Sequence, residues 1–145
     1  MSMVDISAKP EVYREAKAKG SIKLKPETLR LIQKRKVEKG DVFSVAKVAG
    51  ILAAKNTCNL IPLCHPLSLT NVELDLRIVD DSVEAESTVK TKAQTGVEME
   101  ALVAVSVALL TVWDMTKQYE KDRFGQYPST AIENVHVVSK IKKSA

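Results

Sequence analysis

Cysteines, aromatic residues and long apolar runs are all scarce in this chain. Its two cysteines, Cys58 and Cys64, cannot build the disulfide framework of a small secreted protein, so a reducing compartment is expected. The longest apolar stretch, ALVAVSVALLTVW, is shorter than the roughly 18 residues of a membrane-spanning helix. The first residues, MSMVDISAKPEVYREAK, lack the basic segment and apolar block of a secretory signal. These absences predict a cytoplasmic protein without a membrane segment.

What the chain does contain is the composition of a globular domain. Of its 145 residues, 45% are hydrophobic and 28% are charged, so residues 1–145 are predicted to form a single domain with its own core. The 22 basic and 18 acidic residues give a net charge of +4. Because the two signs are interspersed and aromatic residues for base stacking are few, the case for a nucleic acid is weakened, and a small polyphosphate fits the basic surface as well.

The first half of the chain is predicted to be one strand and two helices followed by a stiff loop. SIKLK at 21–25 alternates as a short edge strand would, and Pro26 suits the first turn of a helix over 26–37. A second helix over 42–56 follows a candidate N-cap, Asp41, and its apolar residues fall at helical spacing. In LIPLCHPL at 60–67, each proline disfavours helical geometry in the residue before it, which predicts a constrained loop.

The second half is predicted to be a hairpin, a long helix and a final strand. VELDLRIV and VEAESTVKTK alternate on either side of a DDS turn. Thr95 and Glu98 have the spacing of a capping box before a helix over 96–120, whose uncharged middle, 101–113, should be buried nearly all round. IENVHVVSKI closes the chain as a strand. This order predicts an α+β, ferredoxin-like (split βαβ) fold: an antiparallel sheet with helices packed on one face and one additional helix.

Cys64 and His65 are the first candidates for chemistry. A zinc site needs about four ligands, and the chain offers only two cysteines and two histidines without short paired spacings, so we assign no metal ligand. Cys64 could be a nucleophile, although free cysteines are more often buried and inert. His65 could be an ordinary hydrogen-bonded loop residue. The flanking prolines fix its direction, however, which favours a binding loop.

Carboxylates at the two ends of the long helix are the other candidates. Glu100 lies at the edge of the apolar run, where either a solvated or a functional carboxylate is possible. Asp114 and Lys117 are three residues apart on one helix face, so they form either a surface ion pair or an acid–base pair with a partly desolvated lysine. Glu100 and Asp114 are separated by about 21 Å along the helix axis. If both are functional, they belong either to separate pockets or to one pocket shared across a subunit interface.

Six dispersed motifs resemble the molybdenum cofactor biosynthesis protein C family. They are MVDIS-K at 3–9, KGDVF at 39–43, AGI-AAK at 49–55, LIPLCHPL at 60–67, TGVEMEAL at 95–102 and DM-K at 114–117. Their order and intervals also fit, and together they extend over most of the chain. The resemblance weakens at the C-terminus, where SKIKKSA lacks the family's glycine-rich stretch and follows a longer insert around RFGQYPSTA.

The resemblance implies an enzyme, a lyase of the phosphorus–oxygen type known as cyclic pyranopterin monophosphate synthase. The family converts (8S)-3′,8-cyclo-7,8-dihydroguanosine 5′-triphosphate to cyclic pyranopterin monophosphate and releases diphosphate, in molybdenum cofactor (molybdopterin) biosynthesis. It implies no cofactor, although Mg²⁺ can accompany the triphosphate. It also implies a homohexamer, built as a trimer of dimers with active sites at the dimer interface.

Carried over by position, the resemblance also implies the roles of individual residues. The catalytic aspartate falls on Asp114 and its partner lysine on Lys117, and Lys39 in KGDVF is a further active-site lysine. The substrate-binding residues fall on Leu63, Cys64, His65, Glu98, Met99, Glu100, Arg14 and Lys140.

Two other functions remain open on the residues alone. A ferredoxin-like nucleic-acid-binding module is disfavoured because the two hairpin strands carry no aromatic residues. A nucleotide sensor without catalytic activity is disfavoured because Asp114, Lys117 and Lys39 are all present.

Overall fold

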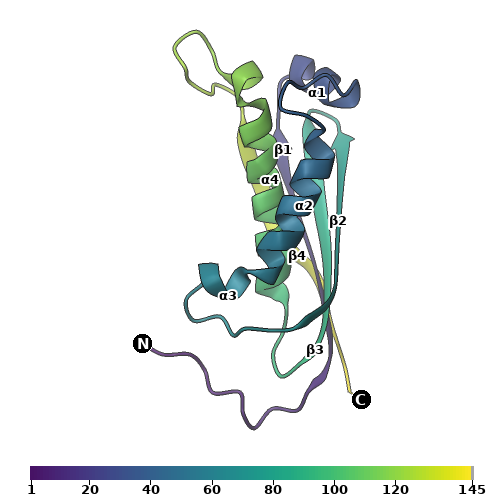
Figure 1. Ribbon diagram of the computed structural model, residues 1–145, viewed down its shortest axis with the longest axis vertical. Helices are drawn as coiled ribbons and strands as arrows, with labels where there is room; N and C mark the ends of the chain where they lie inside the picture. The colour runs from purple at the N-terminus through teal and green to yellow at the C-terminus, as the bar shows by residue number, and fades with distance from the viewer. Residues whose placement is uncertain (145) are drawn as a thin grey trace.

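The computed structural model describes residues 1–144 as a four-stranded sheet with helices on one face (Figure 1). The sheet order is β2-β3-β1-β4, and every neighbouring pair is antiparallel. This is the predicted α+β, split βαβ arrangement; two helices are additional to it, one of them a single short turn, where one was predicted. The elements are β1 (Val12–Lys23), α1 (Pro26–Gln33), α2 (Val42–Lys55), α3 (Thr57–Leu60), β2 (Leu69–Val79), β3 (Ser82–Ala93), α4 (Glu98–Glu120) and β4 (Ala131–Lys143).

The first strand differs most from its prediction. β1 is a central strand between β3 and β4, not a short edge strand, and it begins nine residues before SIKLK. Its helix-facing positions include Ala16, Ala18 and Gly20, which are too small to give a strong apolar alternation. A side chain at Gly20 would meet Val135, Leu109 and Val105, so the strand has small residues because α4 and β4 pack closely against it.

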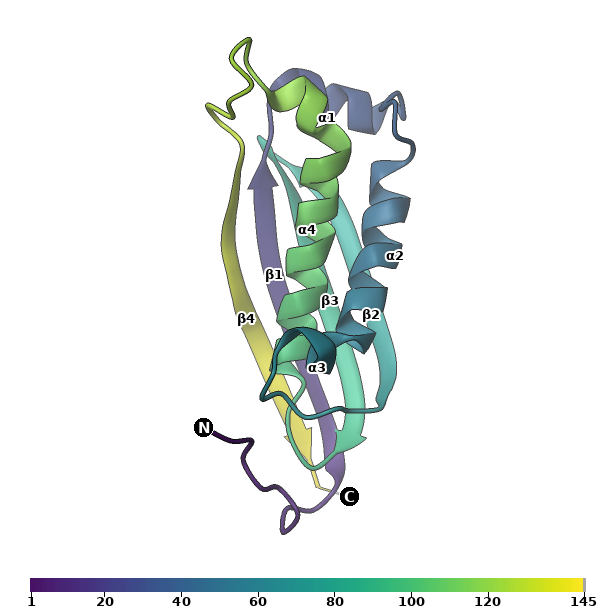
Figure 2. The same cartoon turned by 60° about the vertical axis from the view of Figure 1, so that its left-hand side comes forward.

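Local sequence signals predicted both of the first helices, but they did not predict where α1 ends. α1 ends at Gln33, four residues earlier than predicted, and Arg35 then adopts a positive φ of 56° that breaks the helical path. Asp41 caps α2 as predicted, because its Oδ1 accepts from the backbone N–H of Ser44 at 3.4 Å. α2 then runs antiparallel to α4 across the helical face of the sheet (Figure 2).

Small residues, rather than large ones, form the buried side of α2. Ala46, Gly50 and Ala54 face the core, and a Cβ at Gly50 would lie only 2.8 Å from the backbone oxygen of Ala104 in α4. The larger residues of α2 therefore point outward, where Val48 and Leu52 are 58% and 53% exposed. Because the backbones of α2 and α4 approach closely, α2 buries the side that carries its small residues and leaves larger apolar residues exposed.

The long helix α4 is the centre of the core, but it is not buried all round as predicted. Its inner side, which includes Val105, Leu109 and Val112, is fully buried against the sheet. Its outer side carries Leu110, which is 56% exposed. By length and composition α4 could cross a membrane, yet 56% of its apolar window is buried inside this fold, as in the core helix of a soluble protein.

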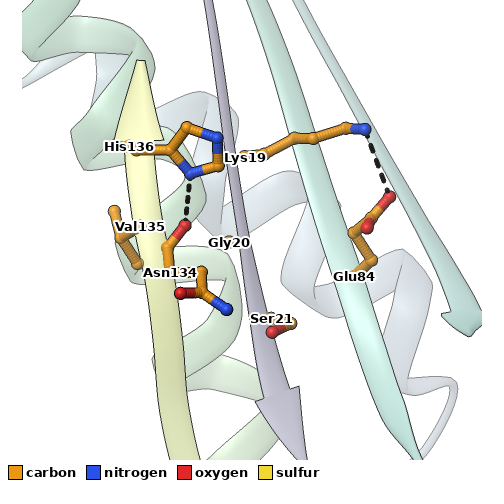
Figure 3. Close-up of a pocket in the computed structure, with 7 residues that line it drawn as sticks. All are labelled: Lys19, Gly20, Ser21, Glu84, Asn134, Val135 and His136. Carbon is orange, nitrogen blue, oxygen red and sulfur yellow. Dashed lines mark hydrogen bonds and ion pairs between the residues drawn. The ribbon is translucent and has the colours of Figure 1, made fainter. Parts of the chain in front are cut away.

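The sheet face without helices is covered by charges that pair with one another. Lys19 lies between Glu84 and Glu86, at 3.7 and 3.5 Å, and Lys17 lies 3.8 Å from Glu86. A shallow hollow of about 630 Å³ lies on this face. Figure 3 shows Lys19 pointing toward Glu84 and the His136 ring beside the backbone oxygen of Asn134. The distance from His136 Nδ1 to that oxygen is 2.5 Å. None of the candidate site residues lines this hollow.

At the far end of α4, one buried carboxylate joins three segments of the chain. Glu120 is fully buried and accepts hydrogen bonds from the backbone N–H of Lys25, the hydroxyl of Thr28 and the hydroxyl of Thr130. Lys25 is the N-cap residue of α1, and its side chain makes no capping hydrogen bond. Glu120 supplies an acceptor at this helix start instead. The C-terminus of α4, the start of α1 and the start of β4 are held together by this side chain.

Candidate active site

Asp114, near the C-terminal end of α4, is held between two lysines. Lys39 Nζ donates to Asp114 Oδ2 at 3.0 Å and to the Asp114 backbone oxygen at 3.1 Å, while Lys117 Nζ lies 3.2 Å from Oδ1. The Lys39 contact joins the α1–α2 connection to α4, across 75 positions of the chain. The structure thus brings together all three residues to which catalysis was assigned.

The two lysines keep Asp114 ionised. Hydrogen bonds from Lys39 first, and then from Lys117, lower the pKa of its carboxyl below the ordinary value. All three side chains are between 42% and 59% exposed, so within a single chain the pair lies at the surface and neither lysine is desolvated. The reason is position, because Asp114 projects from the outer side of α4, away from the sheet. The arrangement offers one carboxylate that can accept a proton and two cations that can hold an anion.

A cavity of about 400 Å³ opens beside Asp114 and Lys117. Its apolar walls include Trp113 and Tyr127, whose rings meet edge to face with centroids 5.1 Å apart. Tyr127 belongs to the insert RFGQYPSTA after α4, to which no functional residue was assigned from the sequence. The chain has only three tyrosines and one tryptophan, so a tyrosine in the insert could have indicated a role for this segment in the site.

Glu100, near the other end of α4, has the opposite environment. Its side chain is only 3% exposed, so it is not a solvated carboxylate. Cys64 Sγ donates to Glu100 Oε2 at 3.8 Å, whereas Oε1 is buried without a hydrogen-bond partner in the part of the chain described. Burial raises the pKa of Glu100. A protonated carboxyl at this position would offer a donor as well as an acceptor.

Cys64 is not set up as a thiolate. Burial, followed by the charge of Glu100, raises the pKa of its thiol. A nucleophilic cysteine needs the reverse, a nearby cation or helix N-terminus that lowers its pKa. Between residues 1 and 144, no three His, Cys, Asp or Glu side chains are grouped closely enough to hold a metal ion.

In the loop that carries Cys64 and His65, Ile61 is extended, as the following proline predicts. Residues 61–64 then form a turn, in which the Cys64 N–H donates to the Ile61 carbonyl oxygen at 3.1 Å. His65 Nε2 lies 2.7 Å from the backbone oxygen of Val4, so the histidine contacts the N-terminal segment. Leu67 packs against the core, but Leu60 and Leu63 are 55% and 45% exposed. Leu60 and Leu63 therefore do not anchor the loop in the core, and Leu63 presents an apolar side chain beside Cys64.

The predicted capping box at the start of α4 does not form. Val97 is the N-cap residue and no side chain caps the helix. The carboxylate of Glu98 instead folds back over Gly96, where a Cβ would collide with it, and Lys140 Nζ pairs with Glu98 Oε1 at 3.4 Å. Met99 is 39% exposed at the same end of the helix.

Arg14 lies at the Glu100 end of the molecule and is largely buried. Its Nε donates to the backbone oxygen of Ala93 at 3.1 Å, and a terminal nitrogen donates to that of Gln94 at 3.3 Å. These bonds tie β1 to the connection before α4. Within one chain, Arg14 and Lys140 are thus separated from Lys39, which lies at the other end of α4.

The comparisons with known proteins decide the family. A sequence model described as the MoaC family matches residues 3–143. The chain belongs to the MoaC family. It is 57% identical over 140 residues to a probable cyclic pyranopterin monophosphate synthase of Sulfolobus acidocaldarius, covering 97% of this chain and 98% of the relative.

Two further relatives carry the same name. The protein of Sulfurisphaera tokodaii is 56% identical, with 97% of this chain and 93% of the relative covered. That of Pyrococcus horikoshii is 55% identical, with 98% and 89% covered. The six motifs therefore indicated the correct family, and membership of the MoaC family makes this chain an enzyme of the synthase type. Both clusters of candidate residues lie within the matched range.

Proposed function

We propose that this chain is a cyclic pyranopterin monophosphate synthase, a phosphorus–oxygen lyase of molybdenum cofactor biosynthesis. Its substrate would be (8S)-3′,8-cyclo-7,8-dihydroguanosine 5′-triphosphate, and its products cyclic pyranopterin monophosphate and diphosphate. The observation that carries the proposal is the Asp114 carboxylate, held by Lys39 at one oxygen and by Lys117 at the other. The name shared by relatives that match nearly the whole chain supports the same activity.

Asp114, Lys117 and Lys39 supply the chemistry expected of such a reaction. Ring opening and closure require proton transfers, and the ionised Asp114 carboxylate can take a proton that the Lys117 ammonium can return. Departure of diphosphate creates negative charge on oxygen. Lys39, which already points its ammonium group at this position, would stabilise that charge.

The residues at the Glu100 end are proposed to bind the purine-derived ring. A flat heterocycle presents N–H and C=O groups along its edge, and the unpartnered Oε1 of Glu100 can bond either kind once the carboxyl is protonated. Cys64 and His65 would contribute the adjacent polar contacts, and Leu63 and Met99 the apolar ones. Glu98 would orient Lys140, which, with Arg14, would hold phosphate oxygens.

Two copies of the chain would be needed to unite the two ends of α4. The ends lie about 21 Å apart along one helix axis, which is too far for one small substrate to span by contacts to both. The outer side of α4 between them is apolar and partly exposed at Leu110 and Met99. A twofold, antiparallel pairing of this side would bring Asp114 of one chain close to Glu100 of the partner subunit. We propose such dimers, assembled three at a time into a hexamer.

Two expectations about the setting of the enzyme are also part of the proposal. The chain is proposed to act in the cytoplasm and to need no resident cofactor. Any Mg²⁺ would enter with the triphosphate as part of the substrate, because triphosphates commonly carry this ion.

The proposal is tested by replacing Asp114 with asparagine. Asp114→Asn keeps the shape of the side chain but removes its proton affinity, so diphosphate release from the cyclised GTP substrate should fall by a factor of about 10² to 10⁴. Asp75→Asn, on the exposed side of β2, is the matched control and should release diphosphate at the normal rate. A normal rate in Asp114→Asn would contradict the assignment.

A further inference from the structure

The connection between α1 and α2 carries Lys39 on a tight turn. Val37 anchors this connection with a side chain that is only 6% exposed, and the Gly40 N–H bonds the Val37 carbonyl oxygen at 3.1 Å. Gly40 has a φ of 123°, which allows the chain to reverse here. Lys39 itself is half exposed, so its own packing does not determine where its ammonium group lies.

Two residues at the end of α4 bind the residue that precedes Lys39. The Glu38 backbone N–H donates to the Tyr119 hydroxyl at 2.9 Å. The side-chain amide of Gln118 donates to Glu38 Oε2 at 3.0 Å. The Tyr119 ring packs against the hydrophobic core, which makes its hydroxyl a fixed acceptor rather than a mobile one.

We propose that Tyr119, assisted by Gln118, is a positioning residue that sets the location of Lys39 against Asp114. Asp114 and Tyr119 belong to the last two turns of one helix, so their separation is fixed by the helix itself. The turn at 38–40 is therefore bound at two points of a rigid element, through Glu38 and through Lys39. The inference rests on the proposed function, in which Lys39 stabilises the leaving diphosphate.

The hydroxyl, not the ring, carries this role. Tyr119→Phe keeps the packing of the ring but removes the acceptor for the Glu38 N–H, which frees the turn to move. Lys39 would then donate to Asp114 less often, and the carboxyl would lose part of the hydrogen bond that lowers its pKa most. A change that only loosened the fold would leave the titration of Asp114 unaltered.

The experiment measures the pKa of the Asp114 carboxyl by carbon-13 NMR in the intact protein without substrate. The variants are Tyr119→Phe, Lys39→Gln and the two combined, with Gln118→Leu as a second test of the same contact. Tyr119→Phe should move the Asp114 pKa upward toward that of Lys39→Gln, and the double variant should titrate like Lys39→Gln alone. Tyr13→Phe, which loses a hydroxyl contact to Glu15 on the charged sheet face, is the matched control and should titrate like wild type.

Steady-state kinetics provide the second readout. Tyr119→Phe should lower kcat/KM by about three- to tenfold, the scale of one lost hydrogen bond, and move the acidic limb of its pH profile to higher pH. The inference is overturned if Asp114 titrates in Tyr119→Phe as in wild type, or if the shifts of the two single variants add in full. If wild-type protein fails to release diphosphate, the proposed function fails, while the NMR titration still decides the role of Tyr119.

Discussion

The two ends of α4 place the same chemical group in opposite surroundings. Asp114 is exposed and bonded by two cations, so the pKa of its carboxyl is lowered. Glu100 is buried with one oxygen unpartnered, so the pKa of its carboxyl is raised. Neither environment follows from residue type. One helix thus carries a proton acceptor at one end and a potential hydrogen-bond donor at the other, and its length determines how far apart they are.

The largest effect on turnover is expected when two inactive variants, each altered at a different end of α4, are combined in one dimer. Asp114→Asn and Glu100→Ala chains should each be nearly inactive, but their co-expression should restore about a quarter of wild-type turnover. Random pairing makes half of the dimers mixed, and one of the two shared sites in each mixed dimer is intact. Diphosphate release from the purified mixture measures this.

A matched mixture shows whether the sites are truly shared. Asp114→Asn and Lys117→Met alter the same end of α4, so their co-expression leaves every shared site with one defect and should restore nothing. Failure of the first mixture to recover activity would mean that each chain holds a complete site.

A smaller but still clear difference is expected within the loop at the Glu100 end. His65→Ala removes a polar group that can reach a bound ring, and should lower kcat/KM by about tenfold or more. Cys64→Ser retains a donor toward Glu100 and should lower it by less than about threefold. Substrate-dependent rates of the two variants measure the order, and the reverse order would favour a cysteine thiolate in the reaction.

Glu100→Gln is expected to change stability in a pH-dependent way. Because the folded-state pKa of Glu100 is raised, the folded protein binds more protons than the unfolded chain above pH of about 4.5, and wild-type stability falls as pH rises toward that raised pKa. Glutamine cannot ionise, so the variant should lack this loss. Urea unfolding at pH 5 and pH 8 should show the variant gaining stability relative to wild type at the higher pH. If the difference in the free energy of unfolding between variant and wild type were the same at both pH values, the Glu100 carboxyl would be solvated and not buried.

The smallest effect on stability is expected for Lys140→Met. The pair of Lys140 with Glu98 is exposed, and such pairs contribute at most about 0.5 to 1 kcal/mol to the free energy of unfolding. If Lys140 binds phosphate, KM should rise while stability stays almost constant. Lys92→Met, on the exposed side of β3, should change neither quantity, and an equal KM change in both variants would argue against a specific role for Lys140.

The sequence was sufficient for the fold class because its strongest signals are local. Alternation in the hairpin, Asp41 at the N-cap of α2 and the long uncharged run of α4 all lie where they were expected. The helix-facing side of β1 was missed because small residues, such as Ala16 and Gly20, take the place of large apolar ones under α4. Packing distance between elements, which decides this choice, is not a local property.

In the candidate site, too, local features could be predicted from the sequence and contacts between distant segments could not. The proximity of Lys39 to Asp114 spans 75 positions, and no spacing rule could have given it; the family motifs indicated both residues without indicating their contact. The predicted bond between Thr95 and the first turn of α4 failed because Val97, not Thr95, is the N-cap, and Glu98 pairs with Lys140 of β4 instead. A capping pattern competes with tertiary partners that the sequence does not reveal.

The carboxylate of Glu120 has a consequence for how this chain can change over evolutionary time. Because it binds Thr130 at one end of the segment 121–130 while belonging to the helix at the other end, it fixes both ends of that segment to α4. Insertions or deletions between these two points would leave the start of α1 and the sheet undisturbed. The segment that contributes Tyr127 to the cavity beside Asp114 can therefore change in length while its two ends keep their positions.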